Sequence, residues 1–326
     1  MSELKHSKFL LLAAVVCSTT AVFAATIPGY PTRPIRLLVP FAPGGSGDAI
    51  ARIITPKLTE AMGQQWVVDN RGGAAGNIAA ETVARAAPDG HTVFLGLSTV
   101  VTANPALYKL SFSMEKDLQA VTMLTISQYI LVLNPSVPAA SVKELIALVK
   151  QKPRSLNYSS GGVGSPLHLA AELFQKRAGI EMVHIPYKGG GASAAAVVAG
   201  ETQFGVSSIA SSMQLVKAGR LKAIATTGLR RSQVAPDLPT LVESGFPGLE
   251  VSSWYGLLVP SGTSTPVVQR IRDEAIKAVQ APDVHQALAR QGLQVVTSTP
   301  QELAARIRSD TKTWAEVIKS AGIKAE

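Results

Sequence analysis

The sequence has almost no cysteine and none of the residue spacings that hold structural metals. A single cysteine, Cys17, occurs among 326 residues. One thiol cannot close an internal disulfide, and no CxxC or Cys/His ligand spacing is present. The sequence therefore predicts neither a disulfide framework nor a metal site, and no cofactor is expected.

The short motifs of common enzyme classes are also missing. The first glycine-rich segment does not end in the Lys-Ser/Thr pair of a phosphate-binding P-loop, and the glycine-rich segments contain no G-x-G-x-x-G. There is no G-x-S-x-G nucleophile elbow, and the histidines lie far apart without HExxH spacing. These absences predict a protein that is not an enzyme.

Length and composition favour a globular chain of two domains. At about 150 residues per domain, the 326 residues suggest two domains, and 46% apolar residues are ample for sizeable cores. The formal net charge is +9, but the lysines and arginines are scattered and form no basic stripe interleaved with aromatics. We expect this charge to serve solubility, with weak steering of anions and no binding of nucleic acid.

The first 24 residues have the pattern of a secretory signal peptide. Lys5 and Lys8 precede an unbroken apolar run over residues 9–16, and small residues occupy both specificity positions before an expected cleavage after Ala24. The alternative is a lipoprotein anchor at Cys17, which is disfavoured because a valine precedes it where a small residue is expected. Export predicts a periplasmic location, and no later apolar run reaches the length of about 18 residues typical of a membrane span.

Short β-branched runs alternate with segments of helical period, which is typical of α/β proteins with largely parallel sheets. Ser141 and Thr299 are helix-start signals, Gly179 and Gly200 are helix stops, and Pro56 should kink or break the first helix. The expected strands are residues 35–41, 66–69, 92–97, 129–133, 156–159, 182–186, 203–207, 223–227 and 254–259. The expected helices are residues 48–62, 78–86, 142–150, 166–178, 192–199, 265–279, 282–290 and 300 to about 320.

Several of these strands run directly into turns rich in glycine and serine that open helices. The turns cover residues 40–48, 70–77, 98–99, 159–166 and 187–193. Free peptide N–H groups and the helix dipole favour anions at such positions, and in open α/β sheets ligands lie beyond the carboxyl ends of the strands. The pattern indicates a neutral hydrogen-bonding cradle for a small anion.

Individual polar residues near these turns allow two interpretations each. Asp48 is either a general base or a brace for the first turn of its helix, and the second is favoured. His168 and Glu172 lie four residues apart and form either a metal-binding pair or a structural contact. Arg71 could pair with a ligand carboxylate or make a surface contact.

Trp254 and Tyr255 allow two interpretations that the sequence does not separate. They either wall a pocket or fill the core where the chain returns between the two domains.

Taken in order along the chain, several blocks resemble the substrate-binding proteins of tripartite tricarboxylate transporters, also called the Bug receptor family. The matching blocks are residues 30–35, 39–48, 69–71, 87–92, 159–165, 186–189, 236–240 and 254–257. The resemblance covers essentially the whole mature chain. One departure is Gly72, where the family commonly has proline after the Asn-Arg pair, and it should loosen that loop.

The resemblance implies a periplasmic receptor with the two-lobed, type II (Venus flytrap) binding-protein fold. Each lobe would be a mostly parallel sheet flanked by helices, and crossover strands would join the lobes. Residues 25–125 with 250–326 would form the first lobe and residues 126–249 the second, with the ligand cleft between them.

The family holds a small carboxylate in that cleft through main-chain amides, hydroxyls and waters, and delivers it to the integral-membrane subunits of the transporter. By this resemblance the ligand-binding residues are Ala42, Pro43, Gly44, Gly45 and Asp48 on one side, Gly162, Val163, Gly164, Ser165 and His168 on the other, and Ser98, Tyr187, Gly189 and Ser207 besides.

Two other functions stay open at this point. The same fold serves a ligand sensor that signals to a membrane partner. A secreted enzyme acting on a carboxylated substrate would use Asp48 and His168 as acid and base.

Overall fold

The computed structural model describes residues 29–324. The expected signal peptide and Cys17 lie outside the described residues. The strands are β1 (Ile35–Val39), β2 (Trp66–Asn70), β3 (Thr92–Leu97), β4 (Leu118–Leu133), β5 (Asn157–Ser160), β6 (Val183–Pro186), β7 (Phe204–Ser208), β8 (Lys222–Thr226), β9 (Ser252–Pro260) and β10 (Gln294–Val295). The helices are α1 (Ser46–Met62), the 3₁₀ turn η1 (Ala74–Gly76), α2 (Asn77–Ala84), α3 (Ser98–Thr102), α4 (Asn104–Leu107), α5 (Val142–Gln151), α6 (Pro166–Ala178), α7 (Gly190–Ala199), α8 (Ile209–Lys217), α9 (Thr265–Gln280), α10 (Pro282–Arg290) and α11 (Pro300–Ala321).

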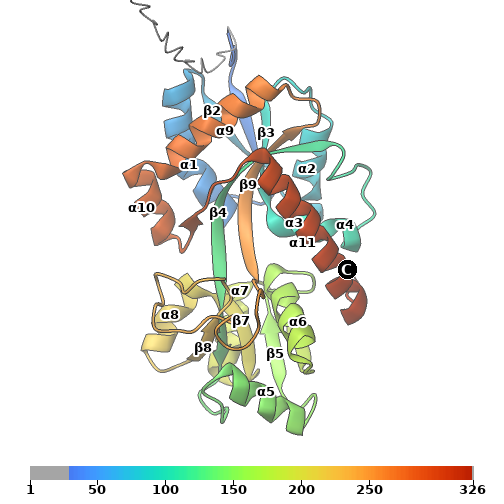
Figure 1. The fold of residues 1–326 in the computed structure, drawn as a ribbon, viewed down its shortest axis with the longest axis vertical. Coiled ribbons are helices and arrows are strands. Elements are labelled where there is room, and N and C mark those ends of the chain that lie inside the picture. Colours follow the sequence, from blue (N-terminus) through green and yellow to red (C-terminus); the bar gives the residue numbers. More distant parts are fainter. Residues whose placement is uncertain (1–28, 325–326) are drawn as a thin grey trace, which may run out of the picture.

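Two bodies lie one above the other along the long axis of the molecule, and the long strands β4 and β9 run between them (Figure 1). The upper body contains β1–β3, α1–α4, α9, α10 and β10, and the lower body contains β5–β8 and α5–α8. The strand order is β2-β1-β3-β9-β4-β7-β5-β6, with β10 and β8 also paired to β4. The strand β4 therefore belongs to the sheets of both bodies.

Each body combines parallel strands with the antiparallel pair that connects them. In the upper body β1 pairs in parallel with β2 and β3, and in the lower body β5 pairs in parallel with β6 and β7. The strand β9 is antiparallel to β3 and β4, and β7 and β8 are antiparallel to β4. The carboxyl ends of the parallel strands carry the turns that the sequence singled out.

Separate hydrophobic cores fill the two bodies. The first core includes Ile50, Ile54 and Phe94 of the upper body, and the second includes Tyr158 and Phe174 of the lower body. A smaller third core lies over the lower sheet and includes the residues Ile130, Val132, Val197, Ile209, Leu221 and Ala235. Burying one large apolar side chain contributes about 1.5–3 kcal/mol, so each core stabilises its own body.

The C-terminal helix α11 packs against both larger cores. Its early residues Leu303 and Ile307 belong to the first core, whereas Trp314, Val317 and Ile318 belong to the second. Figure 1 shows α11 running obliquely from the upper body toward α6. The two bodies are thus connected by β4, β9 and a helix.

Local sequence signals explain where most helices begin and end. The Ser141 hydroxyl accepts a hydrogen bond from the Glu144 amide at 3.2 Å, and Thr299 forms a reciprocal capping box with Glu302. Gly179 and Gly200 end α6 and α7 in the left-handed conformation. These helix signals are confirmed.

Other expectations were wrong or incomplete. The helix α1 continues through Pro56, so the proline does not break it. The first half of β4, the short β10 and the helices α3, α4 and α8 were not predicted. Among residues 29–324, no helix combines the length and apolar character needed to cross a bilayer.

Side chains alternate between two faces of the β4–β9 pair, because successive residues of a strand point to opposite sides. Thr125 lies opposite Tyr255 and Ser127 opposite Ser253, so these side chains share one face with the next alternate residue, Tyr129. We call this the loop face. Ile126 lies opposite Trp254 and Gln128 opposite Ser252, and these four residues form the opposite face.

Candidate functional site

The turn after β1, residues 40–45, forms the upper loop of the candidate site. Ala42, Pro43, Gly44 and Gly45 are all exposed, and Gly45 is the N-cap of α1. Gly44 has a φ of 91°, and no heavy atom would lie within 4 Å of a Cβ added there. The first N–H groups of α1 have no partner within the helix, so the loop presents peptide donors to an open space.

Asp48 holds the upper loop in shape. Its Oδ2 accepts a hydrogen bond from the Gly44 amide at 3.0 Å, and both carboxylate oxygens lie 3.0 Å from Nε of Arg52. These contacts with Arg52 and Gly44 hold the pKa of the buried Asp48 carboxyl below its usual range. The geometry is that of the brace favoured by the sequence.

The turn after β2 packs against the upper loop. Asn70 Nδ2 donates to the Phe41 carbonyl at 3.0 Å, and a Cβ at Gly72 would lie 3.6 Å from the Ala42 amide nitrogen. Arg71 is bound to Asp69, with Nε 3.3 Å from Oδ2, and its side chain is 43% exposed. Arg71 therefore makes a surface ion pair beside the loop.

The turn after β5, residues 161–165, forms the lower loop. Gly162 and Gly164 have φ values of 118° and 71°, which favour glycine, and the exposed Val163 lies between them. The Gly162 amide donates to Ser160 Oγ at 3.2 Å, and the Gly164 amide donates to His168 Nδ1 at 3.0 Å. Ser165 caps α6 by accepting from the His168 amide at 3.2 Å.

Two stacked imidazoles support the lower loop from below. The rings of His168 and His184 lie 3.9 Å apart and nearly parallel, and His184 Nε2 lies 2.7 Å from Ser160 Oγ. Burial lowers the pKa of His168 to about 3, with a further contribution from His184, and lowers that of His184 to about 4. Both rings are neutral near pH 7, so Nδ1 of His168 is free to accept from Gly164.

Glu172 belongs to the same buried group. Its Oε1 accepts a hydrogen bond from the Tyr158 hydroxyl and lies 3.9 Å from His168 Nε2. Burial raises the pKa of Glu172. Within the described residues no group of three or more His, Cys, Asp or Glu is arranged to hold a metal ion.

The remaining predicted site residues fall into different surroundings. A Cβ at Gly161 would lie 3.3 Å from the backbone of Gly189, so the turn after β6 packs on the lower loop. Tyr187 in that turn donates its hydroxyl to Glu201 at 2.9 Å. Ser207 is buried at the end of β7 and accepts from the Ser212 hydroxyl at 2.6 Å.

A third group of polar side chains lies on the loop face of the β4–β9 pair. Tyr255 contacts the start of α1, where a Cβ at Gly47 would lie 3.3 Å from its ring, and its hydroxyl is hydrogen-bonded to Ser46. Tyr129 is hydrogen-bonded to Ser253, and burial raises its pKa to about 12. Sequence reasoning missed Tyr129 and Ser253, although the alternation of polar residues along β4 and β9 could have indicated them.

Ser98 and Trp254 fill the interior beside this group. The Ser98 hydroxyl accepts from the Trp254 amide at 3.3 Å, and Trp254 Nε1 donates to Asp310 of α11 at 2.8 Å. Trp254 is fully buried, so it fills the core and does not wall a pocket.

The structure brings the predicted residues together as two groups. The upper loop packs with the turn after β2, and the lower loop packs with the turn after β6. Within residues 29–324, no hydrogen bond or ion pair joins the upper loop to the lower loop. Chemically, each group offers peptide donors at a helix N-terminus, which suits a carboxylate.

Comparison with known proteins identifies a family for nearly the whole chain. The model of the tripartite tricarboxylate transporter family receptor matches residues 50–323. A protein of the tcbD-tcbE intergenic region of Pseudomonas sp. is 34% identical over 98% of this chain and 95% of its own length. Protein BugT of Bordetella pertussis is 33% identical over 96% of this chain and 98% of its own length.

Solved structures with a similar fold include two that contain carboxylates. The R. palustris protein Rpa4515, determined with adipate, is 32% identical with a TM-score of 0.75 and covers 90% of this chain and 99% of its own. MatC of Rhodopseudomonas palustris, determined with bound malate, is 31% identical with a TM-score of 0.72 and covers 89% of this chain and 100% of its own. A further neighbour is the periplasmic binding protein BugD, which confirms the expected two-lobed α/β fold.

Proposed function

Because this chain belongs to the tripartite tricarboxylate transporter receptor family, we propose that it captures a small carboxylate between its two lobes and delivers it to a tripartite tricarboxylate-type transporter. Members of this family are solute-binding receptors and not enzymes. The adipate and malate found in its structural neighbours support an organic acid as the ligand class. We place the protein in the periplasm, exported by residues 1–24.

One observation carries this proposal. Each body presents a glycine-rich loop at a helix N-terminus in which a side chain of that helix holds a loop amide, Asp48 above and His168 below. A ligand then meets donors that are already in position, which reduces the entropy lost on binding. Since several neutral hydrogen bonds contribute about 1 kcal/mol each, they supply a large part of the roughly 8 kcal/mol of a micromolar complex.

We propose that the lobes are residues 25–125 with 250–326 and residues 126–249, and that closure brings the two loops onto one ligand. The proposed contacts are Ala42, Pro43, Gly44, Gly45, Asp48, Ser98, Gly162, Val163, Gly164, Ser165, His168, Tyr187, Gly189 and Ser207. We add Tyr129, Ser253 and Tyr255, because they share the loop face with the start of α1. Closure is stabilised only by contacts that form when both loops reach the ligand.

The test is a calorimetric titration with adipate and with malate on matched glycine variants. Gly44 and Gly245 both have positive φ and open space around an added Cβ, so Phe at either position carries similar backbone strain. Gly44→Phe should abolish binding because its ring fills ligand space, while Gly245→Phe should bind as the wild type does. Wild-type affinity in Gly44→Phe would show that the ligand lies elsewhere.

The transport role is tested by capture. The carboxylate-loaded receptor should bind the membrane subunits of the transporter more tightly than the free receptor does. Preferential capture of a signalling protein would favour a sensor role.

A further inference from the structure

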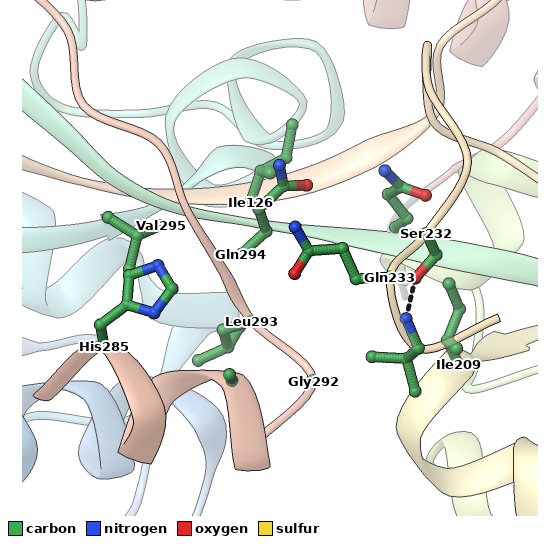
Figure 2. Close-up of a pocket in the computed structure, with 12 residues that line it drawn as sticks. Ile126, Ile209, Ser232, Gln233, His285, Gly292, Leu293, Gln294 and Val295 are labelled. Atoms are coloured by element: carbon green, nitrogen blue, oxygen red, sulfur yellow. Dashed lines mark hydrogen bonds between the residues drawn. The ribbon is translucent and has the colours of Figure 1, made fainter. Parts of the chain in front are cut away.

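A cavity of about 290 Å³ lies between the two bodies, away from both loops. None of the proposed carboxylate contacts lines it. Its upper wall is formed by α10, β10 and the turn between them, and its lower wall by the start of α8 and the loop after β8 (Figure 2). The 12 lining residues are Ile126, Gln128, Ile209, Ser232, Gln233, Val234, His285, Ala289, Gly292, Leu293, Gln294 and Val295.

The floor of this cavity is formed by the β4 residues of the opposite face. Ile126 and Gln128 line it, and they point away from Tyr129, which packs with α6 in the second core. Ile209 of the lower wall packs with Ile130 in the third core, on the same side as Gln128. The carboxylate loops and the cavity therefore lie on two sides of one connecting ribbon.

The cavity lining combines apolar side chains with three glutamine amides, Ser232 and His285, and has no Lys, Arg, Asp or Glu side chain. Leu293 and Ile209 are each 5% exposed and give it apolar walls from the two bodies. Figure 2 shows the Gln233 side chain extending from the lower wall toward Gln294 of the upper wall. The lining has no lysine or arginine to pair with a carboxylate, and its one ionisable side chain is the imidazole of His285. Burying an unpaired carboxylate is costly, so the site favours a neutral molecule over the ligands of the loops.

One buried acceptor in the lining has no partner. Gln128 Nε2 donates to the Arg230 carbonyl at 3.2 Å, which fixes the orientation of the amide, because a carbonyl accepts only from the nitrogen. Oε1 of the same amide is buried and has no hydrogen-bond partner among residues 29–324. A Cβ at Gly228 would overlap this amide, so the glycine is needed to seat it. An unpaired buried acceptor is costly and is satisfied by a donor brought by a ligand.

We propose that this cavity is a second ligand site, which binds a small neutral molecule with an apolar body and one N–H or O–H donor for Gln128 Oε1. Such a molecule contacts the upper and the lower wall at once. The site takes no charged ligand.

Occupancy of this site also opposes closure of the lobes, and this part rests on the proposed function. Rigid bodies that rotate about β4 and β9 approach each other on the loop face and separate on the opposite face. A molecule that bridges the opposite walls therefore favours the open arrangement. By linkage, the molecule in the cavity lowers the affinity of the protein for the carboxylate. The bound carboxylate lowers the affinity for the cavity molecule by the same factor.

Indole and benzofuran are the probes for the site, because they have the same shape but only indole has an N–H donor. Calorimetry on the wild-type protein should show indole binding more tightly than benzofuran by roughly three- to tenfold, the value of one net hydrogen bond. Gln128→Leu should remove this preference. Equal affinity of the two probes for the wild-type protein would overturn the role of Gln128.

A cavity-filling variant locates the site. Ala289 is an exposed residue of α10 that lines the cavity, and Gln286 is an exposed residue of α10 that does not. Ala289→Trp should abolish indole binding, whereas Gln286→Trp should leave it unchanged. Failure of indole to bind the wild-type protein, or equal binding to Ala289→Trp, would overturn the proposal.

The coupling is measured by titrating adipate or malate with and without saturating indole. The carboxylate should bind at least roughly fivefold more weakly in the presence of indole, as is typical of coupled sites, and Ala289→Trp should remove the effect. Unchanged or tighter carboxylate binding would overturn the coupling. Absence of carboxylate binding in every arm would count against the proposed function alone, since indole binding is measured without it.

Discussion

The upper and lower loops have the same form but different supports. Each follows a parallel strand, opens a helix and contains a glycine with positive φ. In the upper loop the Gly44 amide is bound by the carboxylate of Asp48, which Arg52 neutralises. In the lower loop the Gly164 amide is bound by a neutral imidazole, that of His168.

This difference sets how each loop responds to acid. Asp48 remains an anion until the pH falls below the usual range of an aspartate, because Arg52 and Gly44 lower its pKa. The support of the lower loop depends on imidazoles that burial keeps neutral. Similar loops in one protein can therefore have supports that titrate in different pH ranges.

The largest expected effect is on the pH dependence of stability. In the unfolded chain histidine is protonated near pH 6.5, whereas burial lowers the pKa of folded His168 to about 3 and that of His184 to about 4. Between about pH 4 and 6.5 the unfolded state therefore binds more protons than the folded state. The free energy of unfolding should therefore be highest above pH 6.5 and fall on acidification, by up to about 1.4 kcal/mol per pH unit for each histidine. Urea denaturation at pH 7.5, 6 and 5 measures this slope.

Two variants sharpen the test. The double variant His168→Phe/His184→Phe should flatten the slope between pH 7.5 and 5, whereas Asp48→Asn should leave it unchanged. An unchanged slope in the double variant would contradict the assignment of the acid response to the lower loop.

The second largest expected effect is a loss of ligand binding when the support of the upper loop is removed. Asp48→Ala leaves the Gly44 amide and Arg52 without their partner, and hydrogen bonds to a charged group contribute about 1.5–3 kcal/mol. Carboxylate affinity measured by calorimetry should fall roughly tenfold or more. Asp48→Asn keeps an oxygen for Gly44 and should lose less; affinity equal to wild type in Asp48→Ala would show that the brace is dispensable.

Removal of the lower support should have a smaller effect that appears in both stability and binding. His168→Phe preserves the ring stack on His184 but leaves the Gly164 amide without an acceptor, at a cost of about 1–3 kcal/mol if the amide stays buried. Denaturation at pH 7.5 and calorimetry of the same variant measure the two losses. A stable variant with unchanged affinity would mean that the Gly164 hydrogen bond does not shape the loop.

The smallest expected effect comes from the cap of α6. Ser165→Ala should lower the free energy of unfolding by about 1 kcal/mol, the typical value of an N-cap, and weaken ligand binding by a similar amount through the lost hydroxyl. Ser141→Ala is the matched control, because Ser141 caps α5 away from both loops. It should lose the same stability and no affinity; equal affinity in both variants would remove Ser165 from the contacts.

Much of the fold could be predicted because its signals are local. Ser141, Thr299 and Gly179 mark helix ends through contacts with residues three or four positions away. The first half of β4 was missed because both of its faces are largely buried, so its residues lack the alternation of polar and apolar types that marks a half-buried strand. The helix α3 was missed because its β-branched residues are typical of a strand.

The loops of the candidate site could be predicted from glycine and serine alone, but their supports could not. His184 reaches Ser160 and His168 only because β6 pairs with β5, which places His184 beside Tyr158. Nothing near His184 in the sequence indicates that contact. Asp48 and His168 are local contacts by comparison, since each binds the glycine amide four residues before it, Gly44 and Gly164.

The path of α11 across both cores has a consequence for how this protein unfolds. Neither body contains all of its own interior, because Leu303 lies in one core and Trp314 in the other. If the chain were cut at the connecting strands, each body could lose core residues that α11 supplies. We therefore expect thermal unfolding in one cooperative step. Because α11 packs in both cores, it resists rotation of one body relative to the other.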